Sequence, residues 1–226
     1  MTAPSGIGAA RRRRAKRATD LLERRYGSPR HGNKDDPLDE LVYIILSQMT
    51  TGPSYGRVYR RLREACPVWE DAAKMPLPRL KALIKDAGLS HQKAPRLKAI
   101  LERIQQDFGR MSLEGLAEMT DVEAESYLTS LPGVGTKTAK CVLMYSLGRQ
   151  VLPIDTHVFR VGVRLGLLDE QTPATRAHSA LEAVVSPQDR YSFHVNALAH
   201  GRQTCLARFP RCDVCPTRRL CVNRPS

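Results

Sequence analysis

A lysine in the segment Leu131–Ala139 is the first residue whose type and position could do covalent chemistry. The segment reads LPGVGTKTA and places Lys137 near the start of an expected helix. The positive end of the helix dipole disfavours a cation there, so a partly buried lysine would have a lowered pKa and more free amine. A free amine is a nucleophile that forms a Schiff base with an aldehyde-level carbon. The alternative is a solvated lysine at a helix–turn–helix corner.

The glycines of the same segment predict a tight reversal between two helices. Pro132 ends the first helix, and Gly133 and Gly135 permit backbone conformations that other residues avoid. The second helix would begin near Thr136, with unpaired N–H groups that attract anions. The spacing does not match a P-loop. The segment is therefore either a plain helix corner or a phosphate-binding hairpin.

An aspartate in the segment Pro153–His157 is the second candidate for chemistry. Asp155 stands where an N-cap is expected for a helix that carries Val158, Val161 and Leu165. Capping by itself would explain the residue. A capping carboxylate can still present its second oxygen to a cleft.

Four of the six cysteines stand close together near the C-terminus. Their spacing is C-x6-C-x2-C-x5-C, at Cys205, Cys212, Cys215 and Cys221. No secretion signal is recognisable, so we interpret them as metal ligands rather than as a disulfide framework. Four thiolates suit Zn²⁺ or an iron–sulfur cluster, and the single C-x2-C pair with wide outer gaps favours a [4Fe–4S] cluster. Cys66 and Cys141 are expected to be buried, apolar residues.

The charge balance points to a polyanionic partner. The 226 residues include 36 Lys and Arg against 23 Asp and Glu, which gives a net charge of +13. Such an excess favours nucleic acid over an anionic membrane surface. No apolar run approaches the roughly 20 residues of a transmembrane helix. We expect a cytoplasmic, nucleoid-associated protein.

The first residues form an arginine-rich run. Like charges at this density repel one another, so residues 1–19 are expected to be a disordered basic tail. The tail could attract phosphates loosely. An organelle transit peptide is the alternative.

The hydrophobic pattern predicts an all-α chain of short helices. Apolar residues between Leu38 and Met49, and again between Leu97 and Phe108, recur with helical spacing. Thr120 and Glu123 form a capping box that opens a helix running toward Ser130. Further helices are expected to begin near Thr136 and Val158, and two more to carry Leu181 and Phe193. Runs of alternating β-branched residues are absent.

Together these segments resemble the endonuclease III family of DNA glycosylases, within the helix-hairpin-helix superfamily. The resemblance runs from about Pro37 to Cys221. The residues that carry it are Ile45–Gln48, Leu131–Ala139, Ile154–Val161, and His200 to Cys205 with the three remaining cysteines. Their order and spacing together are far more specific than any one segment.

The resemblance implies two helical domains that flank a DNA-binding cleft. One would be a six-helix domain, residues 38–149, containing the hairpin. The other would comprise residues 20–37 plus 150–226 and carry a [4Fe–4S] cluster that is structural or modulates DNA binding. Lys137 would be the catalytic lysine and Asp155 the catalytic aspartate. Gly133, Val134 and Gly135 would offer N–H groups to a DNA phosphate, and Arg208 in the cysteine segment would face DNA.

The family chemistry implied is base excision from damaged duplex DNA by a monomer, with no membrane involved. The damaged base, mainly an oxidised pyrimidine, is flipped out of the stack. Lysine attacks C1′, an imine forms, and β-elimination cuts the strand 3′ to the lesion. The alternatives are a glycosylase with weak lyase activity or with mismatch or alkylated-base specificity, and a non-catalytic DNA-binding iron–sulfur protein.

Two positions depart from the family pattern where DNA would be probed. The glutamine that fills the gap left by the flipped nucleotide is replaced by Met49, so either Gln48 substitutes or Met49 acts as an apolar plug. A second wedge would be Leu89, for which core packing is the alternative. Phe209 stands where relatives often have a basic residue, and Arg208 or Arg211 could replace that contact.

Overall fold

The computed structural model describes residues 6–30, 33–50 and 54–223. In these ranges every regular element is an α-helix or a short 3-10 helix, and no strand occurs, which confirms the predicted all-α class. The chain divides into two compact units. We call Met1–His31 with Gln150–Ser226 the terminal unit, and Gly32–Arg149 the central unit. No helix in the described part of the chain is long and apolar enough to cross a membrane.

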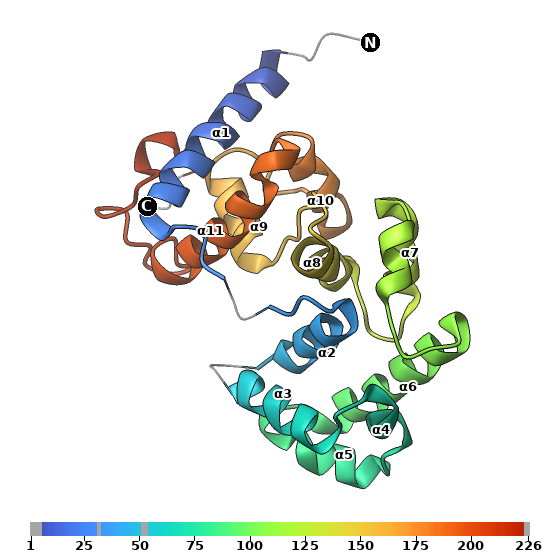
Figure 1. Cartoon of the computed structure of the whole chain (residues 1–226). Coiled ribbons are helices and arrows are strands. Elements are labelled where there is room, and N and C mark those ends of the chain that lie inside the picture. Colours follow the sequence, from blue (N-terminus) through green and yellow to red (C-terminus); the bar gives the residue numbers. More distant parts are fainter. Residues whose placement is uncertain (1–5, 31–32, 51–53, 224–226) are drawn as a thin grey trace. The chain divides into compact units, whose positions relative to one another are not determined.

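The terminal unit is built around one buried helix. Its elements are α1 (Gly6–Tyr26), α9 (Thr156–Arg164), α10 (Ala174–Glu182), η3 (Pro187–Asp189), α11 (Arg190–Gln203) and η4 (Arg218–Leu220). Helix α11 packs against both α1 and α9 (Figure 1). Its residues from Phe193 to Gly201 are all buried. A helix buried on every side belongs at the centre of a unit.

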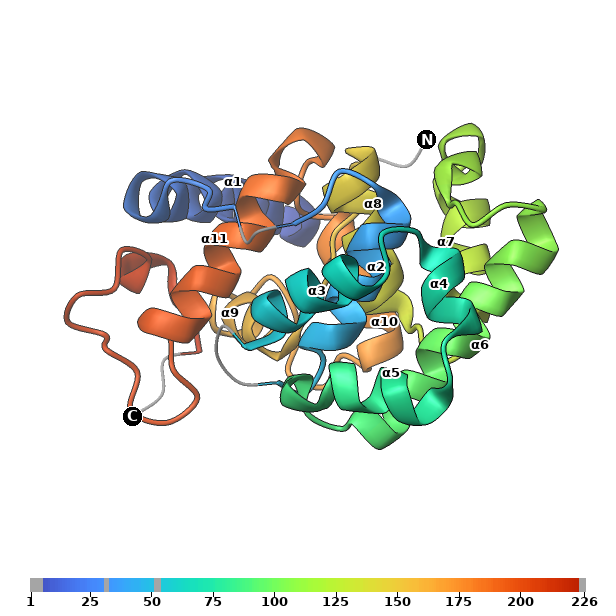
Figure 2. The same ribbon diagram turned by 60° about the horizontal axis from the view of Figure 1, so that its bottom comes forward.

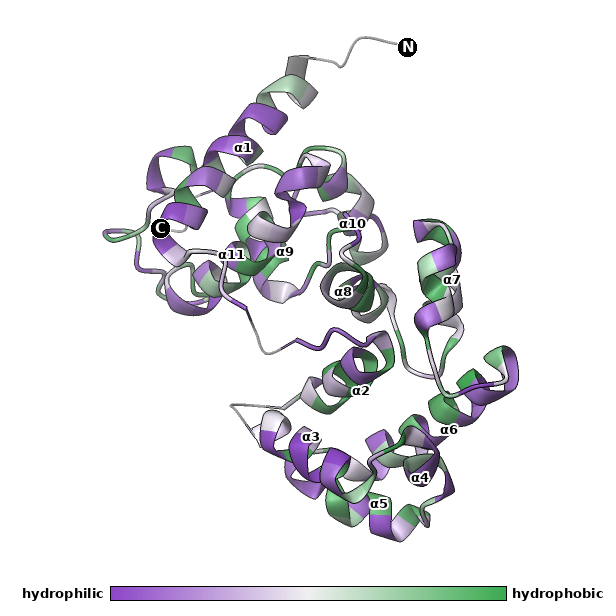
Figure 3. Ribbon diagram, viewed as in Figure 1, coloured by the Kyte–Doolittle hydropathy of each residue, from purple (hydrophilic) through white to green (hydrophobic). Residues whose placement is uncertain are grey.

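Helix α1 corrects the expectation of a disordered basic tail over residues 1–19. Residues 6–19 lie within this helix, whereas residues 1–5 lie outside the described residues. The helix is largely hydrophilic (Figure 3), yet Ala15, Ala18 and Leu22 are at most 1% exposed and belong to the unit's core. An ion pair of Arg11 with Asp169, 2.6 Å between Nη2 and Oδ1, offsets part of the charge repulsion. Burial of this narrow apolar stripe holds the basic helix in place.

The elements of the central unit are α2 (Pro37–Ser47), α3 (Ser54–Ala65), α4 (Trp69–Lys74), α5 (Leu77–Leu83), η1 (Lys85–Ala87), α6 (Ser90–Phe108), η2 (Glu114–Glu118), α7 (Asp121–Ser130) and α8 (Thr136–Leu147). Helix α2 packs against α3 and α8 (Figure 2) and also against α6, whereas α4 and α5 pack against α6, and α7 packs against α8. The described part of this unit has seven α-helices rather than six, because α4 and α5 are separate short helices on either side of Pro76.

Side-chain caps begin two helices that position the site. Asp36 caps α2 by accepting from the N–H of Asp39, with Pro37 at the first helical position. The predicted capping box of Thr120 and Glu123 is present at the start of α7. Such caps satisfy N–H groups that lack partners inside the helix, so both helix starts are well defined.

The unit boundary falls earlier in the chain than the expected position 38. Residues 33–37 belong with the central unit. Asn33 and the N–H of Lys34 donate to the buried carboxylate of Glu40, and the Lys34 carbonyl accepts from Ser146. These hydrogen bonds anchor the segment to α2 and α8.

Candidate active site and cysteine centre

The hairpin between α7 and α8 has two glycines with different roles. Gly133 has φ +70°, and a β-carbon there would collide with the Arg96 side chain. Gly135 has φ −97° and is the N-cap of α8, so its backbone does not require glycine. No atom lies within 4 Å of where its β-carbon would be, which leaves the helix start open. Of these two glycines, only Gly133 therefore adopts the left-handed conformation.

One N–H group expected to face a phosphate already has a partner. The N–H of Val134 donates to the carbonyl of Leu131 at 3.1 Å, and the Val134 side chain is buried. This turn closes the hairpin and fixes its apolar residue in the core. The N–H group of Val134 thus takes part in the turn, and its expected contact with a phosphate stays a prediction.

Lys137 lies in the first turn of α8 and is half-buried. The N-cap is a glycine and offers no capping side chain, and the first N–H groups of a helix have no acceptor inside it. The next residue, Thr138, is buried and accepts a hydrogen bond at 3.3 Å from Nε2 of Gln48, which follows α2. The end of α2 is thus tied to the helix start that carries the lysine.

A buried acidic residue that the sequence analysis missed lies in the electrostatic field of Lys137. Glu40 on α2 is 0% exposed and accepts hydrogen bonds of 2.6 Å from Asn33 Nδ2 and from the Lys34 N–H. Burial raises the pKa of Glu40 to about 7, although these hydrogen bonds and the charges of Lys34 and Lys137 lower it. An acidic residue in a first helical turn is common, so position 40 carried no distinct signal.

The raised pKa of Glu40 predicts a pH-dependent stability. The folded state holds the proton more tightly than the unfolded state, so this contribution is complete below about pH 4.5 and is lost as the pH rises to about 7. Between pH 5 and pH 7 the wild type should lose about 2 kcal/mol of unfolding free energy relative to Glu40→Gln. Urea denaturation at the two pH values measures it. Identical pH dependence in both proteins, or an equal effect of Glu114→Gln at an exposed position, would contradict the assignment.

Asp155 is the N-cap of α9, as predicted. Its Oδ1 accepts from the N–H groups of His157 at 2.9 Å and Val158 at 2.8 Å. Both bonds use Oδ1, so the cap does not occupy Oδ2. The carboxylate is half-buried and held in one orientation by the helix that it starts.

The two expected DNA wedges stand on strained, exposed backbone. Met49 has φ +51° and is 87% exposed, and Leu89 has φ +50° and is 38% exposed. Exposure at this level excludes the alternative that Leu89 packs in the core. A non-glycine residue costs roughly 1–2 kcal/mol in the left-handed region, and such strain gathers at functional sites.

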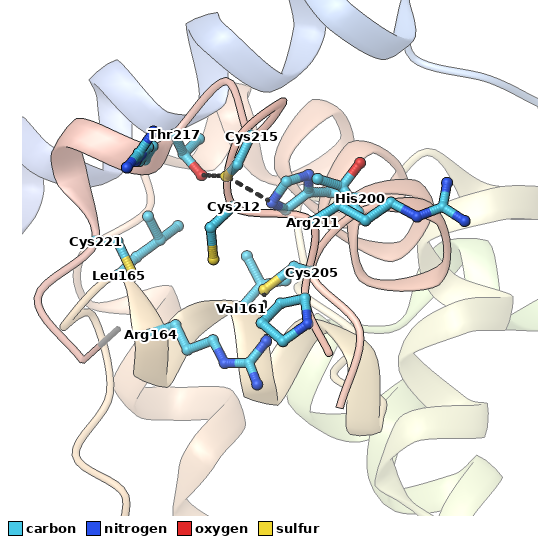
Figure 4. A pocket seen from close by; sticks show the side chains of 13 residues that line it. Val161, Arg164, Leu165, His200, Cys205, Arg211, Cys212, Cys215, Thr217 and Cys221 are labelled. Atoms are coloured by element: carbon cyan, nitrogen blue, oxygen red, sulfur yellow. Dashed lines mark hydrogen bonds between the residues drawn. The ribbon is translucent and has the colours of Figure 1, made fainter. Parts of the chain in front are cut away.

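The four C-terminal cysteines line a single cavity (Figure 4). Each is half-buried and outside any disulfide bond in the described residues, and Val161, Leu165 and Thr217 help to enclose the cavity. Arg164 Nη1 lies 3.1 Å from Cys205 Sγ and donates to it. In the described residues, no three His, Cys, Asp or Glu side chains form a site for a single metal ion. Cys66 and Cys141 are buried, as predicted.

A buried histidine connects the cysteine cavity to α1. His200 Nδ1 lies 2.9 Å from the hydroxyl of Tyr26, and Nε2 lies 3.7 Å from Cys215 Sγ (Figure 4). Burial lowers the pKa of His200 to about 4, and Arg160 and Arg164 act in the same direction. The imidazole is therefore neutral and supports the cysteine loop from inside.

The loop between the first two of these cysteines exposes two basic residues, Arg208 and Arg211, and one aromatic residue. Arg208 is exposed, and Phe209 is 89% exposed with φ +52°. The structure thus places Arg208 at the surface, where a phosphate could reach it.

Comparison with known proteins identifies the family. The sequence profile of the HhH-GPD superfamily, base excision DNA repair proteins, matches residues 42–187. Endonuclease III of Thermotoga maritima is 30% identical over 194 residues, which cover 85% of this chain and 86% of that protein. Endonuclease III of Bacillus subtilis is 32% identical and covers 82% of this chain. The chain belongs to the endonuclease III family.

The solved structures support the same fold for this endonuclease III family member. A trapped covalent complex of endonuclease III with DNA superposes with a TM-score of 0.77, at 26% identity over 93% of this chain and 95% of the other. A thermostable thymine-DNA glycosylase gives 0.80 at 22% identity, which shows the fold. An Arabidopsis thaliana protein named as a DNA glycosylase is 31% identical, but the chain spans only 58% of its length. The protein is a DNA glycosylase of base excision repair.

Proposed function

We propose that the protein is a bifunctional DNA glycosylase and AP lyase that removes oxidised pyrimidines from duplex DNA. The observation that carries the proposal is Lys137, half-buried in the first turn of α8 directly after the glycine hairpin. A primary amine at this point of the family motif is the residue that a lyase needs and a purely hydrolytic glycosylase does not. The trapped covalent complex of a structural neighbour with DNA supports the same chemistry.

In the proposed reaction the two candidate residues have separate tasks. The bond between C1′ and the base breaks, the base leaves with the electron pair, and the carboxylate of Asp155 stabilises the positive charge on the sugar. The Lys137 amine bonds to C1′, and ring opening gives an imine. The imine acidifies C2′, which loses a proton, and the electrons expel the 3′ phosphate.

We propose that the hairpin holds the DNA backbone during this reaction. The N–H groups of Gly133 and Gly135 and of the first turn of α8 would donate to a phosphate. The net charge of +13 favours a duplex DNA partner, which the protein would bind as a monomer. Arg208 would add a phosphate contact from the cysteine loop.

We propose that Cys205, Cys212, Cys215 and Cys221 hold a [4Fe–4S] cluster. The fit rests on four cysteines that line one cavity, with Arg164 donating to Cys205 and so placed to offset thiolate charge. The bound cluster would cross-link the C-terminal loop and modulate DNA binding, and it would take no part in breaking the glycosidic bond.

The cluster assignment predicts a spectrum. The purified protein should absorb near 400 nm and contain about four iron atoms per chain. Cys212→Ser should lose this band, whereas Cys66→Ser, at a buried cysteine outside the cavity, should retain it. A colourless protein with one zinc ion per chain would show that the centre is a zinc site.

A lesion panel tests the proposed substrate. Duplexes carrying an oxidised pyrimidine, a mismatch, an alkylated base or an abasic site are incubated with the protein, and strand cleavage and borohydride trapping are measured. Cleavage and trapping on oxidised pyrimidines support the proposal. Excision without trapping on any duplex would show a monofunctional enzyme.

One observation favours a second candidate, a glycosylase with altered lesion specificity or weak lyase activity. The exposed Met49 takes the place of a polar family residue. The contact that this position makes with the opposite DNA strand would therefore change. In the same panel, Met49→Gln should then shift the lesion preference. If Lys137→Ala and Asp155→Asn retained the protein's function, a non-catalytic DNA-binding role would replace both proposals.

A further inference from the structure

The largest fully buried side chain in the described residues belongs to a lysine. Lys93 on α6 is 2% exposed. Its Nζ donates to the Leu46 carbonyl at 2.7 Å, to the Ala87 carbonyl at 2.7 Å and to the Thr50 hydroxyl at 2.9 Å. An ammonium has three N–H donors, so each of them has an acceptor. All three acceptors are neutral oxygens.

These acceptors lie on two separate segments that each carry an expected DNA wedge. Leu46 and Thr50 flank the segment with Met49, and Ala87 is two residues before Leu89. The backbone N–H of Lys93 also donates to the Leu89 carbonyl at 2.9 Å. The Lys93 side chain therefore contacts both segments, and its backbone N–H closes the first turn of α6 after Leu89.

A hydrogen bond also joins the segments directly, and their backbones approach each other at Gly88. The Thr50 hydroxyl donates to the Ala87 carbonyl. The Met49 carbonyl lies 4.0 Å from the position that a β-carbon on Gly88 would occupy. Leu46 and Ala87 stand at the C-terminal ends of α2 and η1, where carbonyl groups lack partners inside the helix and favour a cation. The ammonium thus bridges the two helix ends in addition to the hydrogen bond of Thr50.

Burying the Lys93 ammonium carries a cost in folding free energy. Burial lowers the pKa of Lys93 to about 8, with Arg96 acting in the same direction, so the charged form is held against a desolvation penalty. Buried charges are often no better for stability than apolar residues of similar size, but they can specify one geometry. Here the hydrogen bonds of Lys93 specify the relative position of the segments that carry Met49 and Leu89. Both of these residues are exposed and have a positive φ.

We propose that the buried ammonium of Lys93 is a positioning group that locks the Met49 and Leu89 segments together, so that both side chains enter the duplex as one wedge. The inference rests on the proposed function, because it takes both residues as DNA probes. Lys93 touches neither the substrate nor the reacting atoms. It acts on the step before chemistry, the displacement of bases from the stack, for which the protein must offer side chains in a fixed relative position.

The experiment separates displacement from chemistry. A duplex carries 2-aminopurine opposite a tetrahydrofuran abasic analogue, and the fluorescence rise at saturating protein reports unstacking. A second substrate, a single-stranded oligonucleotide with an aldehydic abasic site, needs no displacement and is used for borohydride trapping. The variants are Lys93→Met, Thr50→Val, which removes only the hydroxyl, and the control Lys98→Met. Lys98 also lies on α6 and donates to backbone carbonyls, those of Ala73 and Met75, away from both wedges.

We expect Lys93→Met to lose most of the fluorescence rise and to excise a duplex lesion about 100-fold more slowly, because small misplacements have such effects. Trapping on the single strand should stay within about twofold, since the amine at position 137 is unaffected. Thr50→Val should show a smaller loss of the same kind, and Lys98→Met should behave as wild type.

The inference is overturned by a wild-type fluorescence rise in folded Lys93→Met, or by parallel loss on both substrates. If circular dichroism shows that Lys93→Met is unfolded, Thr50→Val decides by the same two readouts. A wild-type protein that traps neither abasic substrate would instead refute the proposed lyase function, while the fluorescence result would still report on the wedge.

Discussion

Lys137→Ala will lose borohydride trapping on abasic duplex DNA and will slow strand cleavage at least about 10³-fold, because the substitution removes the amine that forms the proposed imine. The measurement is single-turnover cleavage together with quantification of the trapped complex. The alanine keeps a good helix former in the first turn of α8, so the fold should persist.

Two controls make this result specific. Binding of Lys137→Ala to a duplex with a tetrahydrofuran abasic analogue should stay close to that of wild type. Lys74→Ala, at an exposed lysine that ends α4, should trap and cleave normally. Undiminished trapping in Lys137→Ala would show that a different amine forms the imine.

Asp155→Asn should lower base excision by about 10²–10³-fold while leaving stability nearly unchanged. The asparagine Oδ1 can still accept from the N–H groups of His157 and Val158, so α9 keeps its cap. What disappears is the negative charge that would stabilise the sugar cation. Single-turnover excision and urea denaturation, measured on the same protein, separate these two effects.

Asp155→Ala provides the matched comparison. It removes both the charge and the cap, so it should lose about 1 kcal/mol of stability in addition to activity. If Asp155→Asn excised bases as fast as wild type, the aspartate would be only a helix cap. The two variants thus distinguish the structural from the chemical contribution of one carboxylate.

Local signals in the sequence predicted much of the fold. The capping box at Thr120, the aspartate cap at Asp155 and the hairpin around Gly133 all depend on residues within a few positions of each other. The helix at residues 6–26 was missed because its arginine run hides an apolar stripe as narrow as Ala15, Ala18 and Leu22. These three residues are buried because α11 packs against α1, and the local sequence does not show that contact.

The buried charges could not be found in the same way. Lys93 and Glu40 look like ordinary surface residues of amphipathic helices, yet both are almost fully buried. The Leu46 carbonyl that Lys93 binds lies 47 residues away in the sequence. Such a partnership depends on tertiary packing, and a single sequence carries no pattern for it.

The division of the chain has a consequence for synthesis on the ribosome. The central unit is one continuous stretch, whereas the terminal unit joins the first segment of the chain to the last. The central unit can complete its core while the remainder is still being translated. Helix α1 is synthesised first, but its apolar stripe can be buried only after α11 has been synthesised. In a stalled or truncated chain, α1 would therefore expose its apolar stripe although the central unit is folded. Such an exposed helix would be a site of proteolysis.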